Sequence, residues 1–452
     1  MLRPALLLFL SACGPPAVDE RPDRLQPTVD DSAAPATTDD ETAAPTETGG
    51  DTDTSADTAP APDTDTGGAP APPEVDEETI GDHEPDDSWI FSNETIHAVE
   101  ITLSSESWSA LQLDPYEYAE ASVTFDGEPM DPVGVRLRGK IGSFRDLYGK
   151  PKFKIDFNQY VEGQRFHGLE TLSLNNEVVD CSYLKEPIAY RLYEEMGVPA
   201  PRTGFTTVTV NGAPYGLYVI IETPDDRFLE RAYEEPDGNL YDGKYVWYGD
   251  YNYTLLDFGD GVDDLYQLEE GTDVGNADIA FVSNTLYLSR LGGSFYADMG
   301  AALDWENFHR FWAVEQWVGQ NDGYVMNTNN YRVYFDPADG LANFVPWDFD
   351  YSFLYGYEWG LDWWSPRGNL AAACLADAEC LAAQQVATAD AIAAAEAAEL
   401  VTLFDEMSAL IADEVAADPR RECSSGSIIY EQSRVREWLE SRSDQMRSEW
   451  GL

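Results

Sequence analysis

The stretch from Gly14 to about Ser88 most constrains what this chain can fold into, because it holds almost no large apolar residues. It consists largely of Pro, Thr, Ala, Gly and Asp, as in DTDTSADTAPAPDTDTGGAPAPPE. Such a segment cannot bury enough apolar surface to offset the entropy that it would lose on ordering. We therefore predict a disordered acidic linker over residues 13–88 and a folded domain over residues 89–452.

The first twelve residues have the features of an export signal, with Arg3 before the apolar run from Ala5 to Leu10. Leu-Ser-Ala-Cys, ending at Cys13, resembles a bacterial lipobox, in which the signal (1–12) is cut before an acylated cysteine. Gly14, rather than Asp, follows the cysteine, which resembles the signal for sorting lipoproteins to the outer membrane in Gram-negative bacteria. The alternative is an ordinary secretory signal with an incidental cysteine. We expect a lipoprotein of the cell envelope, at the outer membrane or cell surface, that meets the membrane only through its lipid.

The net charge of the chain limits its partners. The formal charge is −57 at pH 7. A surface of this sign repels phosphates, so nucleic acid is excluded as a partner, and a basic partner is favoured.

The pattern of apolar and polar residues changes along the folded region. Its first third alternates apolar and polar residues, which is typical of half-buried strands, and helical patterns predominate after Trp305. Residues 206–210 and 215–222 predict a hairpin with an Asn-Gly turn. A strand-rich front and a helix-rich back favour an α+β molecule in two lobes. The predicted strands are Ala98–Leu103, Ala121–Phe125, Val133–Arg138 and Phe153–Phe157, and predicted helices include 182–196, 382–412 and 428–450.

Four cysteines remain after Cys13, and an even number in an exported protein favours disulfides. The five residues between Cys374 and Cys380 suit a local bridge. Cys181 and Cys423 then form the remaining pair. Zinc binding is the alternative interpretation, but no histidine is near in the sequence and the spacing of a zinc motif is missing.

A block rich in Asp and Asn gives the clearest indication of a functional site. It includes Asp322, Asn327 and Asn330, and Asp348 and Asp350 follow it. Oxygen ligands at this density are what magnesium or calcium requires. The five-residue step from Asp322 to Asn327 equals that of the kinase catalytic loop, although the His and Arg of that loop are absent. A turn in which Asp and Asn cap their own backbone is the alternative.

Several blocks of sequence follow one another in order, and they include Val135-Arg-Leu-Arg-Gly139, Lys150-Pro-Lys-Phe-Lys-Ile-Asp-Phe157, Leu172-Ser-Leu-Asn-Asn176, Asn330-Tyr-Arg-Val-Tyr334 and Pro346-Trp-Asp-Phe-Asp350. Together these blocks resemble the CotH kinase family of atypical secreted protein kinases. The resemblance runs from about Ala98 to the C-terminus. It implies a kinase-like fold with a strand-rich lobe at about 95–230 and a helix-rich lobe at about 231–452.

The resemblance also implies the roles of individual residues. Asp322 is the expected catalytic aspartate. Magnesium, or in its place manganese or calcium, is expected on Asp350 with Asp348 and with Asn327 or Asn330. The family pattern does not decide between these two asparagines.

The expected nucleotide contacts lie in the strand-rich part. Lys154 or Lys150 would hold the ATP phosphates, with Arg138 nearby. Lys150, Lys152 and Lys154 recur at period two, so they project from one face if the segment is extended. Glu222 is the expected ion-pair partner or adenine-side residue, and Glu186 is the competing choice.

The tripeptide Asp257-Phe258-Gly259 matches the magnesium-binding motif of protein kinases. It precedes Asp322, however, whereas a metal ligand of this kind should follow the catalytic aspartate. We therefore assign it no metal and predict a surface loop, because Gly259 and Gly261 favour turns.

The implied activity is transfer of the ATP γ-phosphoryl group to Ser or Thr of an exported or surface protein. From the acidic charge we expect a basic acceptor segment. Two alternatives are an inactive kinase-like binding module and a structural surface lipoprotein stabilised by calcium.

The lipid anchor gives a first testable prediction. Cys13→Ser removes the only thiol of the lipobox, so the variant should leave the membrane fraction and take up no labelled fatty acid. Fractionation and fatty-acid labelling measure both. A wild-type protein that takes up no label, with a variant that stays membrane-bound, contradicts the lipobox.

Overall fold

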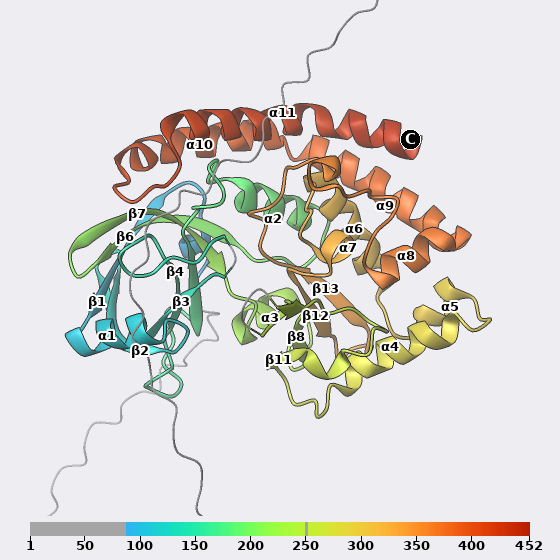
Figure 1. Ribbon diagram of the computed structural model, residues 1–452, viewed down its shortest axis with the longest axis horizontal. Helices are drawn as coiled ribbons and strands as arrows, with labels where there is room; N and C mark the ends of the chain where they lie inside the picture. The colour runs from blue at the N-terminus through green and yellow to red at the C-terminus, as the bar shows by residue number, and fades with distance from the viewer. Residues whose placement is uncertain (1–86, 141, 249–251) are drawn as a thin grey trace, which may run out of the picture. The chain divides into compact units, whose positions relative to one another are not determined.

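Strands and helices both contribute extensively to the part of the chain that the computed structural model describes, residues 87–140, 142–248 and 252–452 (Figure 1). The mixed α+β class is therefore confirmed. The predicted signal and all but the last two residues of the predicted linker lie outside the described residues. The described residues belong to one compact unit, Glu77–Leu452, so the division into two lobes near residue 230 stays a prediction.

Seven strands close into a barrel in the order β1-β2-β3-β4-β5-β7-β6. Neighbouring strands are antiparallel except β1 and β6, whose parallel pairing closes the barrel. In β4, Phe153 and Ile155 are fully buried in the barrel core and alternate with Lys152 and Lys154. The strands are β1 (Ile96–Leu103), β2 (Ala119–Phe125), β3 (Glu128–Arg138), β4 (Lys152–Asp156), β5 (Thr171–Asn175), β6 (Thr203–Val210) and β7 (Ala213–Glu222).

The predicted hairpin is confirmed as β6 and β7. Asn211 and Gly212 join the strands with φ values of 51° and 74°. Positive φ at both central residues is what a tight hairpin turn of this twist requires, and Asn-Gly adopts it readily.

A second sheet has the order β11-β8-β12-β13, and β9 and β10 form a separate pair. The antiparallel pairing of β12 with β13 places the end of β13 beside the start of β12, since Tyr331 faces Pro346. These strands are β8 (Asn239–Asp242), β9 (Val246–Trp247), β10 (Tyr253–Thr254), β11 (Gln267–Glu270), β12 (Tyr331–Phe335) and β13 (Ala342–Pro346).

Helix α6 is buried along most of its length and packs against α2, α9 and α11. In Figure 1, α9, α10 and α11 form an orange-to-red layer at the top. The helices are α1 (Ser105–Leu113), α2 (Lys185–Glu195), α3 (Asp226–Ala232), α4 (Ala277–Ser289), α5 (Phe295–Met299), α6 (Trp305–Val318), α7 (Tyr324–Asn327), α8 (Asn369–Ala376), α9 (Ala378–Ala397), α10 (Leu400–Ala417) and α11 (Ser425–Trp450), with short 3-10 turns at Ser88–Phe91, Asp263–Leu265 and Gly356–Trp359.

The predicted helix over residues 382–412 is two helices, because Glu399 adopts a φ of 49° between α9 and α10. A left-handed residue of this kind ends one helical axis and lets the next begin in another direction. Among the described residues, the structure contains no helix long and apolar enough to cross a membrane.

Both predicted disulfides are present. Cys374 and Cys380 join α8 to the start of α9, and Cys181 joins Cys423 across a sequence separation of 242 residues. The second bridge ties the segment before α2 to the loop between α10 and α11.

The same α10–α11 loop also holds the barrel through a buried ion pair. Lys150 Nζ lies 2.6 Å from Asp418 Oδ2, and both side chains are 0% exposed. Asp418 passes so close to β7 that a Cβ on Gly216 would lie 2.0 Å from its carboxylate. Arg420 donates to the carbonyl oxygens of Tyr148, at 2.8 Å, and Gly149. The loop therefore anchors the segment that leads into β4.

Breaking this ion pair should destabilise the fold strongly. Lys150→Met leaves the Asp418 carboxylate buried without its cation, so the free energy of unfolding should fall by roughly 3–5 kcal/mol. Adding Asp418→Asn should restore part of the loss, because no charge is then left unpaired. Urea unfolding measures both.

The exposed pair of Arg436 and Asp405 is the matched control. Arg436→Met should cost about 1 kcal/mol or less, because solvent screens an exposed pair. Equal losses for Lys150→Met and Arg436→Met would contradict the structural role of the buried pair.

Candidate functional site

A buried lysine of the barrel meets two carboxylates from the segment after β13. Lys152 Nζ lies 3.4 Å from Asp350 Oδ2 and 3.9 Å from Asp348 Oδ1. The β3–β4 register places Lys152 opposite Arg138, at the end of the strand pair. Asp348 adopts a φ of 54°, a strained conformation for a residue with a side chain. The sharp turn brings both carboxylates of the Asp-Phe-Asp segment toward the barrel.

This cluster holds more negative than positive charge. Burial lowers the pKa of Lys152, but the Asp348 and Asp350 carboxylates outweigh burial and raise it above its usual value. Burial, and then the Asp348 charge, raise the pKa of Asp350 well above its usual value. Glu186 of α2 belongs to the same cluster, and burial followed by Asp348 raises its pKa to about 7. Lys152 and the neighbouring Arg138 therefore meet three carboxyl groups, an arrangement that favours an added cation.

Asp322 lies in the loop between α6 and α7, and three side-chain amides donate to it. Asn327 donates at 2.6 Å, Asn330 at 3.1 Å and Asn329 at 3.3 Å. Burial raises the pKa of Asp322 to about 6, although these amides act to lower it. These are bonds between side chains, so they differ from the alternative in which Asp and Asn cap their own backbone.

Gln320 connects the Asp322 loop to the carboxylate segment. Its Nε2 donates to the carbonyl oxygen of Asp348 at 2.6 Å, and its Oε1 accepts from the Asp322 amide at 3.4 Å. Gln320 is fully buried. Asp322 and the segment of Asp348 and Asp350 are therefore held near each other. The Asp322 charge also contributes to the raised pKa of Asp350.

Both candidate asparagines contact Asp322. Asn327 also accepts from the Arg367 guanidinium through its Oδ1 at 2.6 Å. Asn330 has a φ of 51° at the start of β12. Neither contact assigns a metal to one asparagine, so that choice stays a prediction.

Cationic side chains and an indole adjoin the carboxylates. The Arg138 and Arg332 guanidinium groups lie 5.4 and 5.1 Å from the centre of the Trp347 ring. Lys154 faces Arg136 in the β3–β4 register, and burial followed by Arg136 lowers its pKa to about 8. Arg332 Nε and Nη1 are buried without a hydrogen-bond partner in the described part of the chain, and Nη1 lies 3.8 Å from Asp242 Oδ2. Such a cluster suits an anionic ligand.

Two of the predicted nucleotide contacts have other partners. Lys150 is paired with Asp418, as described above. Glu222 accepts from Arg202 and Arg231, each at 2.7 Å. Glu186, the competing choice, lies instead in the Lys152 cluster.

Sequence reasoning missed the role of Lys152. The available signal was the period-two spacing of Lys150, Lys152 and Lys154, which would place these lysines on one face if the whole segment were extended, whereas β4 begins at Lys152. The spacing could not show which of the three lysines faces Asp350, because that contact spans 198 residues.

Asp257 is buried, so the predicted surface loop is wrong for this residue and for Phe258. Its carboxylate accepts from the backbone N–H of Asn369 at 2.7 Å and from the Tyr324 hydroxyl at 3.0 Å. Burial is the main cause that raises the pKa of Asp257 to about 7. Its hydrogen bonds hold the start of α8 against α7.

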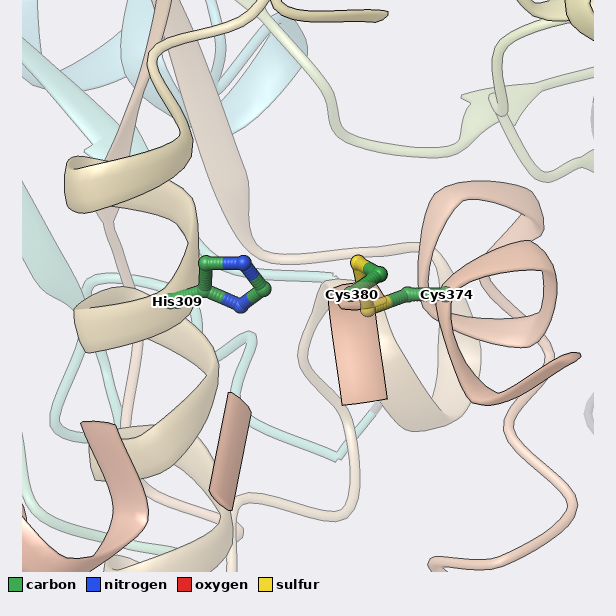
Figure 2. A group of neighbouring side chains, drawn as sticks. All are labelled: His309, Cys374 and Cys380. Atoms are coloured by element: carbon green, nitrogen blue, oxygen red, sulfur yellow. A yellow bond between two sulfur atoms is a disulfide. The ribbon is translucent and has the colours of Figure 1, made fainter. Parts of the chain in front are cut away.

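Although no histidine is near in the sequence, one lies beside a cysteine pair in the fold. His309 of α6 faces the disulfide of Cys374 and Cys380 (Figure 2). Among the described residues, this is the one group of three His, Cys, Asp or Glu side chains with ligand atoms within 4.8 Å of one another. Asp322, Asp348 and Asp350 form no such preformed group. In the disulfide state the sulfurs carry no thiolate for a metal.

Comparison with known proteins identifies a related family. Residues 135–446 match the family model described as CotH kinase protein. Inner spore coat protein H of Bacillus subtilis (strain 168) is 25% identical over 238 residues, which cover 51% of this chain and 59% of that protein. An inner spore coat protein H-like protein of the same strain is 35% identical over 78 residues, 17% of this chain and 24% of that protein. The chain thus spans less than two thirds of either relative.

Two solved structures are distantly similar. The HipA–HipB–operator DNA complex of the Shewanella oneidensis MR-1 toxin–antitoxin system contains a chain 11% identical, with a TM-score of 0.30, covering 78% of this chain and 74% of its own. The Helicobacter pylori proinflammatory kinase CtkA is 10% identical, with a TM-score of 0.27, covering 74% of this chain and 90% of its own. At these TM-scores neither structure defines the fold of this chain.

The Asp322 loop also generates a prediction about pH. Glu315 of α6 accepts from the backbone amides of Tyr324 and Val325 at 2.9 and 3.0 Å, and burial raises its pKa to about 8. At Glu315 the folded state therefore binds more protons than the unfolded state between about pH 4 and 8. The stability that this group contributes falls as pH rises through this range.

Glu315→Gln should reduce that fall, by up to about 1.4 kcal/mol per pH unit where one proton is involved. Urea unfolding at pH 5, 6, 7 and 8 measures the slope. Glu306→Gln, at an exposed position of the same helix, should leave the slope unchanged. Parallel pH curves for wild type and Glu315→Gln would contradict the assignment.

Proposed function

Because this chain belongs to the CotH kinase protein family, we propose that it is a protein kinase that uses ATP and magnesium. It transfers the γ-phosphoryl group to a Ser or Thr hydroxyl of an exported or surface protein. The observation that carries the proposal is the contact of Lys152 with Asp350 and Asp348. It joins a barrel lysine to an acidic segment that follows the Asp322 loop, which is the order of the lysine, the catalytic loop and the metal ligand along protein kinase chains.

The acidic segment fits a divalent cation. Asp348 Oδ1 is buried and accepts no hydrogen bond from the described residues. Magnesium is usually bound by one or two carboxylates together with substrate phosphates, so a preformed cage of three carboxylates is unnecessary. Asp350 and Asp348 would hold the ion, with Asn330 or Asn327, and manganese or calcium could take its place. The ion would neutralise charge on the ATP phosphates.

The cationic cluster fits the nucleotide. Lys152 and Lys154 of β4 and Arg138 of β3 offer positive charge to phosphates on the side of the carboxylates. Arg138 and Arg332 keep the Trp347 indole in place, and an indole can stack on a base. Buried cationic side chains that repel one another destabilise the folded state unless an anion binds between them.

Asp322 would orient the acceptor hydroxyl. Its pKa of about 6 leaves it mostly ionised at neutral pH, yet basic enough to accept a proton from a hydroxyl. The bond from the γ-phosphorus to ADP breaks, the bond to the acceptor oxygen forms, and the hydroxyl proton passes to Asp322. The amides of Asn327, Asn329 and Asn330 hold the carboxylate in position.

The location and the acceptor are part of the same proposal. Acylation at Cys13 would place the enzyme in the cell envelope. The net charge of −57 favours an acceptor segment rich in Lys or Arg, because opposite charge speeds encounter.

Replacing Asp322 and replacing Asp350 should impair different steps, phosphoryl transfer and ATP binding respectively. Asp322→Ala should leave magnesium-dependent ATP binding nearly unchanged and reduce phosphoryl transfer by about 100-fold or more, as expected for a lost general base. Asp350→Ala should weaken ATP binding itself, because the ion loses a ligand. Calorimetry measures binding, and labelled phosphate measures transfer to a basic, Ser-rich peptide.

Asp257→Asn is the matched control, because it changes a buried carboxylate outside the cluster while keeping its shape. It should change neither ATP binding nor transfer. An inactive Asp257→Asn beside a fully active Asp350→Ala would invert the site assignment. A wild-type protein that binds no nucleotide with any divalent metal would favour the binding module, and stabilisation by calcium alone would favour the structural lipoprotein.

A further inference from the structure

Three potential ligands of a soft metal meet where α6 packs against the α8–α9 corner. One nitrogen of His309 and the sulfurs of Cys374 and Cys380 lie within 4.8 Å of one another. All three side chains are buried, with His309 5% and both cysteines 0% exposed. Figure 2 shows the imidazole facing the disulfide. The group shares no residue with the Lys152 cluster.

The imidazole is already arranged as a metal ligand. Its Nδ1 lies 2.7 Å from Gln384 Oε1, which can only accept, so Nδ1 carries the proton and Nε2 carries a lone pair. Nε2 is buried without a hydrogen-bond partner among the described residues. Trp305 stacks on the ring with centroids 5.1 Å apart and holds its orientation. Metal-binding histidines typically donate their other ring N–H to an oxygen in this way.

We propose that the reduced pair Cys374 and Cys380, together with His309 Nε2, forms a binding site for a soft monovalent metal ion, copper(I). The disulfide and the metal site are two alternative states of the same sulfurs. The Cα atoms of the two cysteines are 5.1 Å apart, so both thiols stay at the corner when the bond opens.

The conversion between the two states requires a dithiol reductant. The reductant supplies two electrons, its own sulfurs join as a disulfide, and the Cys374–Cys380 bond breaks. Each cysteine sulfur gains a proton, and copper(I) displaces these protons when thiolates bind it. The oxidation state of copper does not change.

Three ligands favour copper(I) over zinc. Structural zinc is almost always four-coordinate, whereas the described residues place no fourth His, Cys, Asp or Glu in this group. Burial of all three side chains leaves little access for water as a fourth ligand. Thiolates are soft ligands that select copper(I).

The test uses the full chain with Cys13→Ser, so that only the two cysteine pairs remain. The protein is reduced without oxygen, checked for retained fold by circular dichroism, and titrated with copper(I) against a chromophoric copper(I) chelator. The reduced protein should retain one copper per chain, and the disulfide form should retain none. X-ray absorption should show two sulfurs and one nitrogen around the copper.

Matched variants locate the site. Replacing Cys374 and Cys380 by Ser should abolish copper retention, whereas replacing Cys181 and Cys423 by Ser should leave it at one per chain. Gln384→Ala removes the acceptor that orients His309 and should weaken copper binding by about 10–100-fold.

Four results would overturn the proposal. They are equal copper retention with and without Cys374 and Cys380, a copper spectrum that lacks nitrogen, preference of the reduced protein for zinc over copper(I), and loss of the fold on reduction before metal is added.

Discussion

Lys152 joins the barrel to the acidic segment at Asp348 and Asp350, but its single positive charge cannot neutralise the carboxyl groups around it. Lys152 contacts Asp350 and Asp348, and Glu186 adds a third carboxyl group to the same buried cluster. In a medium of low polarity, excess negative charge is stabilised by proton uptake or by an added cation. The raised pKa values of Asp350 and Glu186 reflect the first route, and a bound divalent ion would supply the second.

The C-terminal helices maintain this geometry from a distance. Lys185 at the start of α2 donates to the Asp350 carbonyl oxygen at 3.2 Å and lies 3.1 Å from a Glu431 carboxylate oxygen of α11. The disulfide of Cys181 and Cys423 fixes the segment just before α2 to the segment just before α11. The position of Asp350 therefore depends on residues far beyond the acidic segment, and damage to the α10–α11 loop should reach the candidate site.

Local patterns in the sequence determined much of the architecture. The alternation in β1 to β4, the Asn-Gly turn of the β6–β7 hairpin and the spacing of Cys374 and Cys380 depend on neighbouring residues, so they could be predicted. The grouping of Asp322 with Asn327 and Asn330 was predictable for the same reason, since a short loop keeps them together. The sequence also identified the acidic segment at Asp348 and Asp350.

Only the tertiary structure decided which charges face each other. The period-two spacing suggested that three lysines share one face, but β4 begins at Lys152, and Lys150 meets Asp418 while Lys152 meets Asp350, across sequence separations of 268 and 198 residues. The same holds for His309, which no spacing relates to the disulfide beside it. Side-chain periodicity is a property of a single strand or helix, whereas the partner across a contact is set by how distant elements pack. The sequence by itself therefore determined the elements and the acidic residues, and packing decided the pairs.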